Sequence, residues 1–561
     1  MTSDIRTLAR EQFGVDSLRS GQEEMIEALL SGSDVLGILP TGGGKSLVYQ
    51  LASQLLPGVT LVVSPLLALM KDQKESVEES GIDAESISSA ETKRQEDESL
   101  ERLRRGETKL FYLTPERFQD EQFMSAVQET TVSLLVVDEA HCVSEWGHDF
   151  RPAYLGLAGA ARRLGGPTKL ALTATATPWV RDEIVDRLDL RRPRIVVRDV
   201  NRSNLFLEVL RPDRLEDKPI LLRQLLCDPT ERYGRRINQR LDRAMQGSGI
   251  IYVRTTREAR DVASLLRGWG IKADYYHGQR PKVDRTRVQD SFMSGDIRVV
   301  VATNAFGMGV DKSDVRFVVH WDVPASIEEY FQEAGRAGRD GQLARCTLLY
   351  WSPDLERASF LASSGSVTIE DVERLRSSLL PPGCRRRLKE TELISGLSRS
   401  RVLRTAALLE RSGLLDQGRG GLRLLDDFDP KAVSLRHQER HRSYERSRTA
   451  MMRRYAEANE CRREFILNYF GEEFDGSDCL CDIHALPSDH SKQMSNDVSA
   501  SHGFGLGVRV SHDALGQGTI EHASGTEVTV LFDEVGYKTI DLRFALSHHA
   551  LRRLDEAGAT R

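Results

Sequence analysis

The chain has 561 residues, of which 29% are charged, and a formal net charge of −6 at pH 7. A chain of this length is expected to form about three to five domains, and its net charge gives no global signal for a polyanionic partner. It contains no run of eighteen apolar residues and no apolar N-terminal signal, so we expect a cytoplasmic protein that does not enter a membrane. The seven cysteines are too few for a disulfide framework, and three cluster at positions 461, 479 and 481, which favours a local metal site.

A glycine-rich turn follows the apolar run Val35 to Leu39 and precedes a helix-forming segment. Strand, glycine turn and helix form the context in which a Gly-Lys-Ser ending predicts a phosphate-binding loop. Glycines let backbone N–H groups close around a triphosphate, and the helix directs its positive end at the anion. We therefore predict an ATP and Mg²⁺ site, with a flexible surface turn as the alternative, at Thr41, Gly42, Gly43, Gly44, Lys45 and Ser46.

Two further residue sets complete the predicted nucleotide site. Gln22 lies just upstream of the loop, and its amide matches the donor and acceptor edges of adenine. The buried run before Asp138 and Glu139 is typical of a parallel strand, whose carboxyl end lies at the ligand-binding edge of the sheet. Asp138 is expected to hold Mg²⁺ through water together with Ser46, and Glu139 to orient or deprotonate the attacking water.

An aromatic-rich segment follows directly after His141. Aromatic rings offer faces on which unpaired bases stack, and neighbouring cationic side chains favour phosphates. A buried aromatic stripe is the alternative, but the Gly, Pro and charged neighbours argue against a core helix. We predict a nucleic-acid contact formed by Trp146, Phe150 and Tyr154 with His148 and Arg151.

Four stretches resemble the motifs of superfamily 2 helicases: Gly42 to Ser46, Asp138 to His141, Leu172 to Thr177 and Gln332 to Gly341. The segment His141 to Tyr154 closely resembles the aromatic-rich loop of RecQ-type DNA helicases. The resemblance implies an α/β fold with two RecA-like parallel-sheet motor domains, at residues 1–203 and 204–352. It also implies a 3′ to 5′ DNA helicase that acts during repair or recombination, on single-stranded and duplex or forked DNA, close to the nucleoid.

The second motor domain is expected to complete both sites. Arg336 and Arg339 are three residues apart on a predicted helix and would share one face, pointing across the cleft at the γ-phosphate. By resemblance, Arg339 is the arginine finger and Arg336 a second phosphate ligand. The resemblance also places Asp311 and Gln332 at the nucleotide, and the neighbours Thr303 and Asn304 at the DNA phosphates.

Beyond the motor, residues 353–430 resemble a small winged-helix module. Its presumed recognition helix carries Arg399, Arg401 and Arg404, and its wing tip carries Arg419. A three-helix connector explains the pattern equally well. The module precedes the predicted zinc site, whereas RecQ proteins usually have the reverse order.

Residues 431–490 are predicted to form a basic helical module with a structural zinc site. The segment from Lys431 to Glu464 contains ten basic and five acidic residues. We therefore expect it to contact a nucleic-acid phosphate backbone, with a solvated helix face as the alternative. The segment starting at Cys461 strongly resembles the RecQ zinc-binding helix, and three thiolates with one imidazole suit Zn²⁺. The predicted ligands are Cys461, Cys479, Cys481 and His484, with Asp478 as an alternative to Cys479 and a metal-free remnant as the alternative to the site.

Residues 491–505 are polar and Ser-rich and are predicted to be a linker. Residues 506–561 show short strands separated by glycine turns and resemble the Tudor-like domain of UvrD/PcrA-type helicases, which implies a small β-barrel and RNA polymerase as a partner. Two other functions stay open: an RNA helicase of the same superfamily, and a recruitment protein with a vestigial motor.

Overall fold

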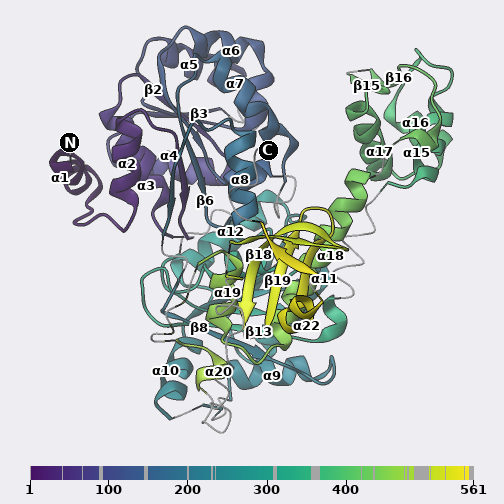
Figure 1. Cartoon of the computed structure of the whole chain (residues 1–561). Coiled ribbons are helices and arrows are strands. Elements are labelled where there is room, and N and C mark those ends of the chain that lie inside the picture. Colours follow the sequence, from purple (N-terminus) through teal and green to yellow (C-terminus); the bar gives the residue numbers. More distant parts are fainter. Residues whose placement is uncertain are drawn as a thin grey trace.

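The computed structural model describes residues 2–40, 42–65, 67–87, 93–144, 150–198, 201–228, 232–233, 235–307, 312–355, 367–418, 420–433, 436–472, 474, 476, 479–485, 504–505, 507–524, 526–548 and 550–554. Figure 1 shows two stacked α/β domains, a small module that projects to one side, and a β-rich C-terminal domain that lies against the second α/β domain.

Motor domain 1 contains a seven-stranded sheet in the order β3-β4-β2-β5-β6-β1-β7, and all its paired strands are parallel. Both faces of a parallel sheet are covered by helices, which explains why strands such as β1 and β4 are continuous buried runs instead of alternating patterns. The strands are β1 (Val35–Ile38), β2 (Val59–Val63), β3 (Ala84–Ile87), β4 (Leu110–Leu113), β5 (Val132–Val137), β6 (Thr168–Thr173) and β7 (Arg194–Val197).

Helices cover the two faces of this sheet and form two separate cores. One face is covered by α1 (Thr2–Phe13), α2 (Gln22–Leu30), α3 (Lys45–Leu55) and α4 (Leu67–Glu79). The other is covered by α5 (Lys93–Arg104), α6 (Glu121–Gln128), α7 (Leu157–Arg163) and α8 (Pro178–Arg187), with the short 3-10 turns η1 (Pro115–Gln119), η2 (Ala140–Val143) and η3 (Pro152–Gly156).

Motor domain 2 repeats this architecture with six parallel strands in the order β10-β11-β9-β12-β13-β8. They are β8 (Leu205–Leu210), β9 (Ser248–Tyr252), β10 (Ala273–Tyr276), β11 (Val299–Ala302), β12 (Val315–His320) and β13 (Ala344–Leu349). One face packs against α9 (Asp217–Leu226), α10 (Arg235–Met245) and α11 (Thr256–Gly268), and the other against α12 (Lys282–Ser294) and α13 (Ile327–Ala334). The expectation of two parallel-sheet motor domains is confirmed.

The projecting module has its own hydrophobic core and a three-stranded antiparallel sheet in the order β14-β16-β15. Its elements are α15 (Ile369–Leu379), β14 (Arg385–Arg386), α16 (Leu388–Ser395), α17 (Arg399–Arg411), β15 (Leu415–Gly418) and β16 (Gly421–Leu424). The β15–β16 hairpin follows α17, and the winged-helix assignment stays a prediction. On α17, Arg401 pairs with Asp371 of α15 at 2.9 Å, whereas Arg419 lies outside the described residues.

The helices that follow belong to the core of motor domain 2. They are α18 (Arg436–Glu457), α19 (Arg462–Tyr469) and the short α20 (Asp482–Ala485). Tyr455 of α18 packs on Tyr330 of α13, with ring centroids 5.1 Å apart. The expectation of a phosphate-binding basic face is wrong for Arg448, Arg462 and Arg463, because all three are buried and bonded within the protein.

The C-terminal domain is an antiparallel sheet in the order β20-β19-β18-β17-β21. It contains β17 (Arg509–His512), β18 (Gly516–Ser524), β19 (Glu527–Phe532), β20 (Gly536–Asp541), α22 (Leu542–Ser547) and β21 (Leu551–Arg553). Tyr537 of β20 lies between the rings of Tyr444 on α18 and Tyr469 on α19, at 6.0 and 5.5 Å. Residues 491–503 of the predicted linker lie outside the described residues, whereas Phe504 is buried in the core of the C-terminal domain, which is docked on the helices that precede it.

A buried carboxyl group lies where the C-terminal domain approaches α8 of motor domain 1. Glu521 of β18 is 0% exposed, and neither of its oxygens has a hydrogen-bond partner. Burial raises the pKa of Glu521 to about 8, although the nearby Arg181 acts in the opposite direction. Glu521 is therefore protonated in the folded protein at neutral pH.

This raised pKa makes stability depend on pH. The unfolded chain releases the Glu521 proton above its ordinary pKa of 4.5, whereas the folded chain retains it up to about 8. The contribution of Glu521 to stability is thus complete below pH 4.5 and declines by about 1.4 kcal/mol per pH unit up to about pH 8. We expect Glu521→Gln to flatten the fall in Tm over this range, as measured by thermal unfolding. Glu534→Gln on the exposed neighbouring turn is the control, and equal pH slopes for Glu521→Gln and the parent would contradict the assignment.

Candidate nucleotide site and metal centre

The phosphate loop joins β1 to α3 at the carboxyl edge of the motor domain 1 sheet. Gly44 precedes α3 with φ of 74°, in the left-handed region that glycine adopts without strain. The helix begins at Lys45, whose Nζ donates to the backbone oxygens of Leu39 at 3.2 Å and Pro40 at 3.4 Å. Lys45 thus lies folded over the loop, and Thr41 lies outside the described residues.

Gln22 supports this loop from α2. Its Nε2 donates to the backbone oxygen of Gly44 at 2.9 Å, and its Oε1 accepts from the N–H of Arg19 at 2.8 Å. The amide also touches the loop so closely that a Cβ at Gly44 would lie 2.4 Å from Nε2. In this structure the amide that was expected to recognise adenine fixes the loop backbone.

Two carboxylates face the loop from the end of β5. Burial and the neighbouring Glu139 raise the pKa of Asp138 to about 7. Burial lowers the pKa of Lys45, while the charges of Glu139 and Asp138 act to raise it. Glu139 has φ of 48°, an uncommon conformation for a residue with a side chain, and its Oε2 lies 3.4 Å from His141 Nδ1. The lysine and both carboxylates therefore share one desolvated environment.

The two arginines reach this environment from motor domain 2, but they do not lie on a helix. Helix α13 ends at Ala334, and the chain continues as turns through residue 340. The helix expectation is wrong because Gly338 adopts φ of 59° and bonds through its N–H to Val315, which leaves no continuous helical backbone. Arg336 is 7% exposed and donates to the backbone oxygen of Gly307.

Arg339 closes the site across the two domains. A Cβ at Gly42 would lie 3.1 Å from Arg339 Cγ, so the arginine stem rests on the phosphate loop. Arg336 and Arg339 both act electrostatically on Lys45. The structure thus brings together Lys45, Asp138, Glu139, Arg336 and Arg339. Gln332 is half-buried on α13, and Asp311 lies outside the described residues.

The aromatic-rich segment is described only in part, because Trp146 and His148 lie outside the described residues. Phe150 is half-buried, and Arg151 Nη1 donates to the backbone oxygen of Pro65 at 2.8 Å. The expectation of base stacking is wrong for Tyr154 in this structure. Its side chain is 0% exposed within the core, and its hydroxyl donates to the backbone oxygen of Asp138 at 3.1 Å.

The predicted phosphate contacts of motor domain 2 follow β11. Thr303 is nearly buried and its N–H bonds to the backbone oxygen of Tyr276 at 3.2 Å, whereas Asn304 is exposed. The sequence pattern did not identify Arg202, which lies in the connection between the motor domains and contacts the turn that carries Arg336 and Arg339. A single arginine between two strands carries no recognisable spacing signal.

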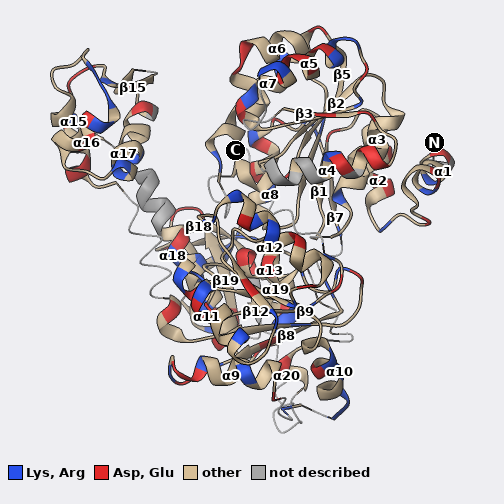
Figure 2. Ribbon diagram, turned by 180° about the vertical axis from the view of Figure 1, so that it is seen from behind, with Lys and Arg blue, Asp and Glu red and all other residues tan. Residues whose placement is uncertain are grey.

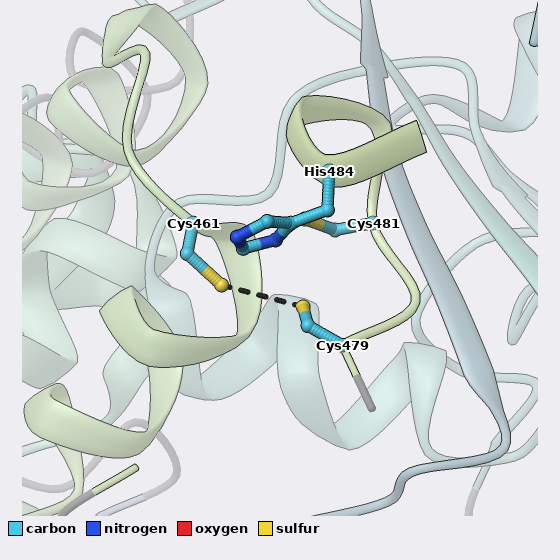
Figure 3. Close-up of side chains that lie close together, drawn as sticks. All are labelled: Cys461, Cys479, Cys481 and His484. Carbon is cyan, nitrogen blue, oxygen red and sulfur yellow. Dashed lines mark hydrogen bonds between the residues drawn. The ribbon is translucent and has the colours of Figure 1, made fainter. Parts of the chain in front are cut away.

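Four potential metal ligands converge beside α19 and α20 (Figure 3). Their ligand atoms all lie within 4.8 Å of one another. Cys461 Sγ lies 3.3 Å from Cys479 Sγ, and Cys481 Sγ lies 3.3 Å from His484 Nδ1. Ligands of a tetrahedral zinc ion lie about 3.3 to 3.8 Å apart, so three sulfurs and one nitrogen in this arrangement fit Zn²⁺. Asp478 lies outside the described residues.

The metal-ligand cluster is attached to the edge of the motor domain 2 sheet. Cys481 forms a parallel bridge with Leu207 of the edge strand β8. Asp482 accepts from the N–H of Val209 at 3.0 Å and pairs with Arg462 at 3.0 Å. The cluster therefore joins α19 to this sheet.

Acidic and basic residues are distributed over both motor domains (Figure 2), in accord with the small net charge. Among the described residues, no helix is long and apolar enough to cross a membrane.

Comparison with protein families gives three matches in chain order. Residues 19–183 match the DEAD/DEAH box helicase family, residues 233–341 the helicase conserved C-terminal domain, and residues 422–485 the RecQ zinc-binding family. The "Probable ATP-dependent DNA helicase RecS" of Bacillus subtilis is 35% identical over 83% of this chain and 88% of its own length. The "ATP-dependent DNA helicase RecQ" of the same organism is 38% identical over 67% of this chain, which spans 61% of that relative.

Solved structures share the fold at low sequence identity. The DNA-bound DUF1998 helicase MrfA has a TM-score of 0.50 and 16% identity, covering 77% of this chain and 64% of its own. Dbp5 of S. cerevisiae, bound to RNA and ADP BeF3, has a TM-score of 0.50 and 18% identity, covering 64% of this chain and 89% of its own.

Proposed function

Because the chain belongs to the RecQ family of superfamily 2 helicases, we propose that it is an ATP- and Mg²⁺-dependent DNA helicase acting in repair or recombination. The observation that carries the proposal is the convergence of one lysine, two carboxylates and two arginines from both motor domains. A site divided between two domains is complete only when they meet, and this couples hydrolysis to domain motion.

Each group of the site has a role in the proposed reaction. Lys45 and the backbone of Gly42, Gly43 and Gly44 hold the β- and γ-phosphates, together with Thr41. Ser46 and Asp138 would hold Mg²⁺, which neutralises phosphate charge when bound. Glu139 orients the attacking water, and Arg336 and Arg339 stabilise the charge of the transferring phosphoryl group. Asp311 and Gln332 complete the nucleotide contacts.

Single-stranded DNA is the proposed substrate of the outer surface. Unpaired bases stack on Trp146 and Phe150, and phosphates bind His148, Arg151, Thr303 and Asn304. The position of the aromatic-rich segment directly after η2 supports this, since its chain continues from Glu139. Movement from 3′ to 5′ and a location at the nucleoid are part of the proposal.

The test is ATP turnover by the full chain with single-stranded DNA, RNA or neither, followed by strand separation on duplexes with 3′ or 5′ tails. We expect stimulation by DNA and unwinding from a 3′ tail. Stimulation by RNA alone would favour an RNA helicase. Turnover that is the same with and without polynucleotide, and unchanged in Trp146→Ala, would refute the proposal.

A substitution of Tyr154 distinguishes a structural role of this residue from a role in base stacking. Phenylalanine keeps the ring but removes the donor to the Asp138 carbonyl, so Tyr154→Phe should lower the unfolding free energy by about 1 kcal/mol. DNA affinity, measured by fluorescence anisotropy, should stay within about two-fold of the parent. Phe150→Ala is the matched comparison and should lose more DNA affinity than Tyr154→Phe. A Tyr154→Phe variant with parental stability would contradict the buried hydrogen bond.

We propose that Cys461, Cys479, Cys481 and His484 bind one structural Zn²⁺. The supporting observation is that their three sulfur atoms and one nitrogen atom lie close enough together to bind a single Zn²⁺ ion. When bound, zinc cross-links α19 to the loop that meets β8 and supplies no chemistry to hydrolysis. Cys479 is the proposed third thiolate.

Zinc removal has a predictable consequence. Cys481→Ser should reduce the metal content to below about one fifth of an equivalent and lower Tm, because a hydroxyl is a poor zinc ligand. Mass spectrometry of the native protein and thermal unfolding measure both quantities. Cys227→Ser changes an exposed cysteine outside the cluster and serves as the control. Full zinc content in Cys481→Ser would exclude this ligand set.

A protein partner, RNA polymerase by resemblance, is proposed for the outer side of the C-terminal domain. Phe544 on α22 is 66% exposed, whereas Tyr537 is buried against the zinc-binding helices. Loss of polymerase binding in Phe544→Ala, with ATP turnover retained, would support recruitment by this surface. Unchanged polymerase binding in Phe544→Ala would exclude this surface as the binding site.

A further inference from the structure

Arg202 lies in the chain between the motor domains and holds the turn that follows α13. Its Nη2 donates to the backbone oxygens of Ala337 at 2.9 Å and Gly338 at 2.8 Å, and its Nη1 donates to that of Gly335 at 3.2 Å. A guanidinium offers several donors in one rigid plane, so it can fix several carbonyls of one turn at once.

Side chains from outside the turn also hold its backbone carbonyls. The last carbonyls of a helix have no partner within it, and here α13 ends at Ala334 and the chain continues as turns, in which Gly338 is left-handed. Asn204, which follows Arg202 by two positions in the chain, supports the same turn. Its Nδ2 donates to the backbone oxygens of Gly338 and Gln342, both at 2.8 Å.

The same turn carries both arginines of the nucleotide site. Arg336 and Arg339 flank two of the three carbonyls that Arg202 contacts, those of Ala337 and Gly338, and Arg339 rests on the phosphate loop of the other domain. A shift of this turn therefore moves both guanidinium groups. Misplacement of a catalytic group by about 1 Å can reduce a rate by about 100-fold.

Arg463 holds Arg202 from the zinc-binding module. It is 3% exposed and follows Cys461 by two residues on α19. Its Nη1 donates to the backbone oxygen of Arg202 at 2.7 Å and to Asn201 Oδ1 at 2.8 Å, and its Nη2 donates to the backbone oxygen of Leu205 at 2.7 Å. A continuous set of hydrogen bonds thus runs from α19 through the interdomain connection to the arginine turn.

We propose that Arg202 and Arg463 are positioning residues for ATP hydrolysis, which transmit the placement of the zinc-binding helix to Arg336 and Arg339. This inference rests on the proposed ATPase function. The zinc-binding module thus has a role at the nucleotide site. Its metal ligands lie apart from that site and are connected to it by these hydrogen bonds.

The test is steady-state ATP turnover with single-stranded DNA, together with equilibrium binding of a fluorescent ADP. Arg202→Ala should lower kcat by about 10- to 100-fold, with nucleotide affinity within about three-fold and zinc content unchanged. Arg198→Ala is the matched control, because this exposed arginine begins the same connection but pairs with Glu24 of motor domain 1. It should retain parental turnover.

Non-additivity separates positioning from a general structural role. If Arg202 acts through Arg336 and Arg339, Arg202→Ala should reduce kcat by a smaller factor in a chain that already carries Arg339→Ala, where only Arg336 is left to position, than in the parent. Independent, multiplicative losses in the double variant would overturn the proposal, as would a parental kcat for Arg202→Ala.

Conservative variants guard against misfolding. Arg202→Lys keeps the charge but loses the fork and should have an intermediate kcat at parental Tm. Asn204→Ala removes a second support of the turn and should lower kcat in the same direction, and Arg463→Lys should do likewise with zinc retained. Parental kcat in all three would overturn the inference, whereas absence of turnover in the parent chain would refute the proposed function itself.

Discussion

Lys45→Ala should abolish ATP hydrolysis, with kcat reduced by about 1,000-fold or more. Lys45 starts α3 at the phosphate loop and is the cation of motor domain 1 that faces both Asp138 and Glu139. Without it, the two carboxylates remain close to the site where the β- and γ-phosphates are proposed to bind. Like charges repel in a buried site, so nucleotide affinity should also fall. Release of phosphate and equilibrium nucleotide binding measure these two losses.

Two further variants serve as comparisons for Lys45→Ala. Lys93→Ala, on the exposed side of α5, should leave turnover and binding unchanged. Glu139→Gln removes one negative charge and the group that orients water, so it should bind nucleotide at least as well as the parent while hydrolysing it about 100-fold more slowly. If Lys45→Ala retained more than about a tenth of parental turnover, the loop would not be the phosphate site.

Arg339→Ala should reduce kcat by about 100-fold or more while nucleotide binding to motor domain 1 persists. The arginine stem rests on Gly42 of the other domain, so its guanidinium is positioned at the site only when the domains meet. The loss should therefore appear in kcat and in unwinding more than in affinity for ADP. Lysine lacks the planar fork that binds phosphate oxygens in pairs, so Arg339→Lys should not restore the rate.

Arg336 provides a contrast on the same turn. It is buried and donates to the backbone oxygen of Gly307, so Arg336→Ala should lower both kcat and Tm. Arg257→Ala, on the exposed face of α11, is the control for loss of an arginine in motor domain 2. Equal effects on affinity and kcat in Arg339→Ala would place this residue in ground-state binding instead of the transition state.

The sequence predicted the two parallel sheets because a strand segment buried on both faces is apolar, as Leu134 to Val137 of β5 are. It also predicted the phosphate loop, since glycine turn and helix start are local features of the chain. The grouping of residues 461, 479, 481 and 484 was predictable for the same reason, because cysteine spacing limits what a single metal ion can reach.

The role of some residues depends on what packs against them, and only the tertiary structure determines that role. The aromatic spacing did not distinguish Tyr154, which is buried beneath Asp138, from rings available to bases. The helix expected for Arg336 and Arg339 is a turn, because Gly338 is held by contacts with Asn204 and Arg202 from another part of the chain.

The residues of the proposed hydrolysis site in motor domain 1 are thus predictable from the sequence, because short motifs carry their own strand, turn and helix signals. The position of the arginine turn is determined only by the fold. Arg202 and Arg463 are 261 positions apart in the chain, and their hydrogen bond exists only because α19 packs beside β8. No local pattern encodes such a contact, since its energy comes from groups that folding alone brings together.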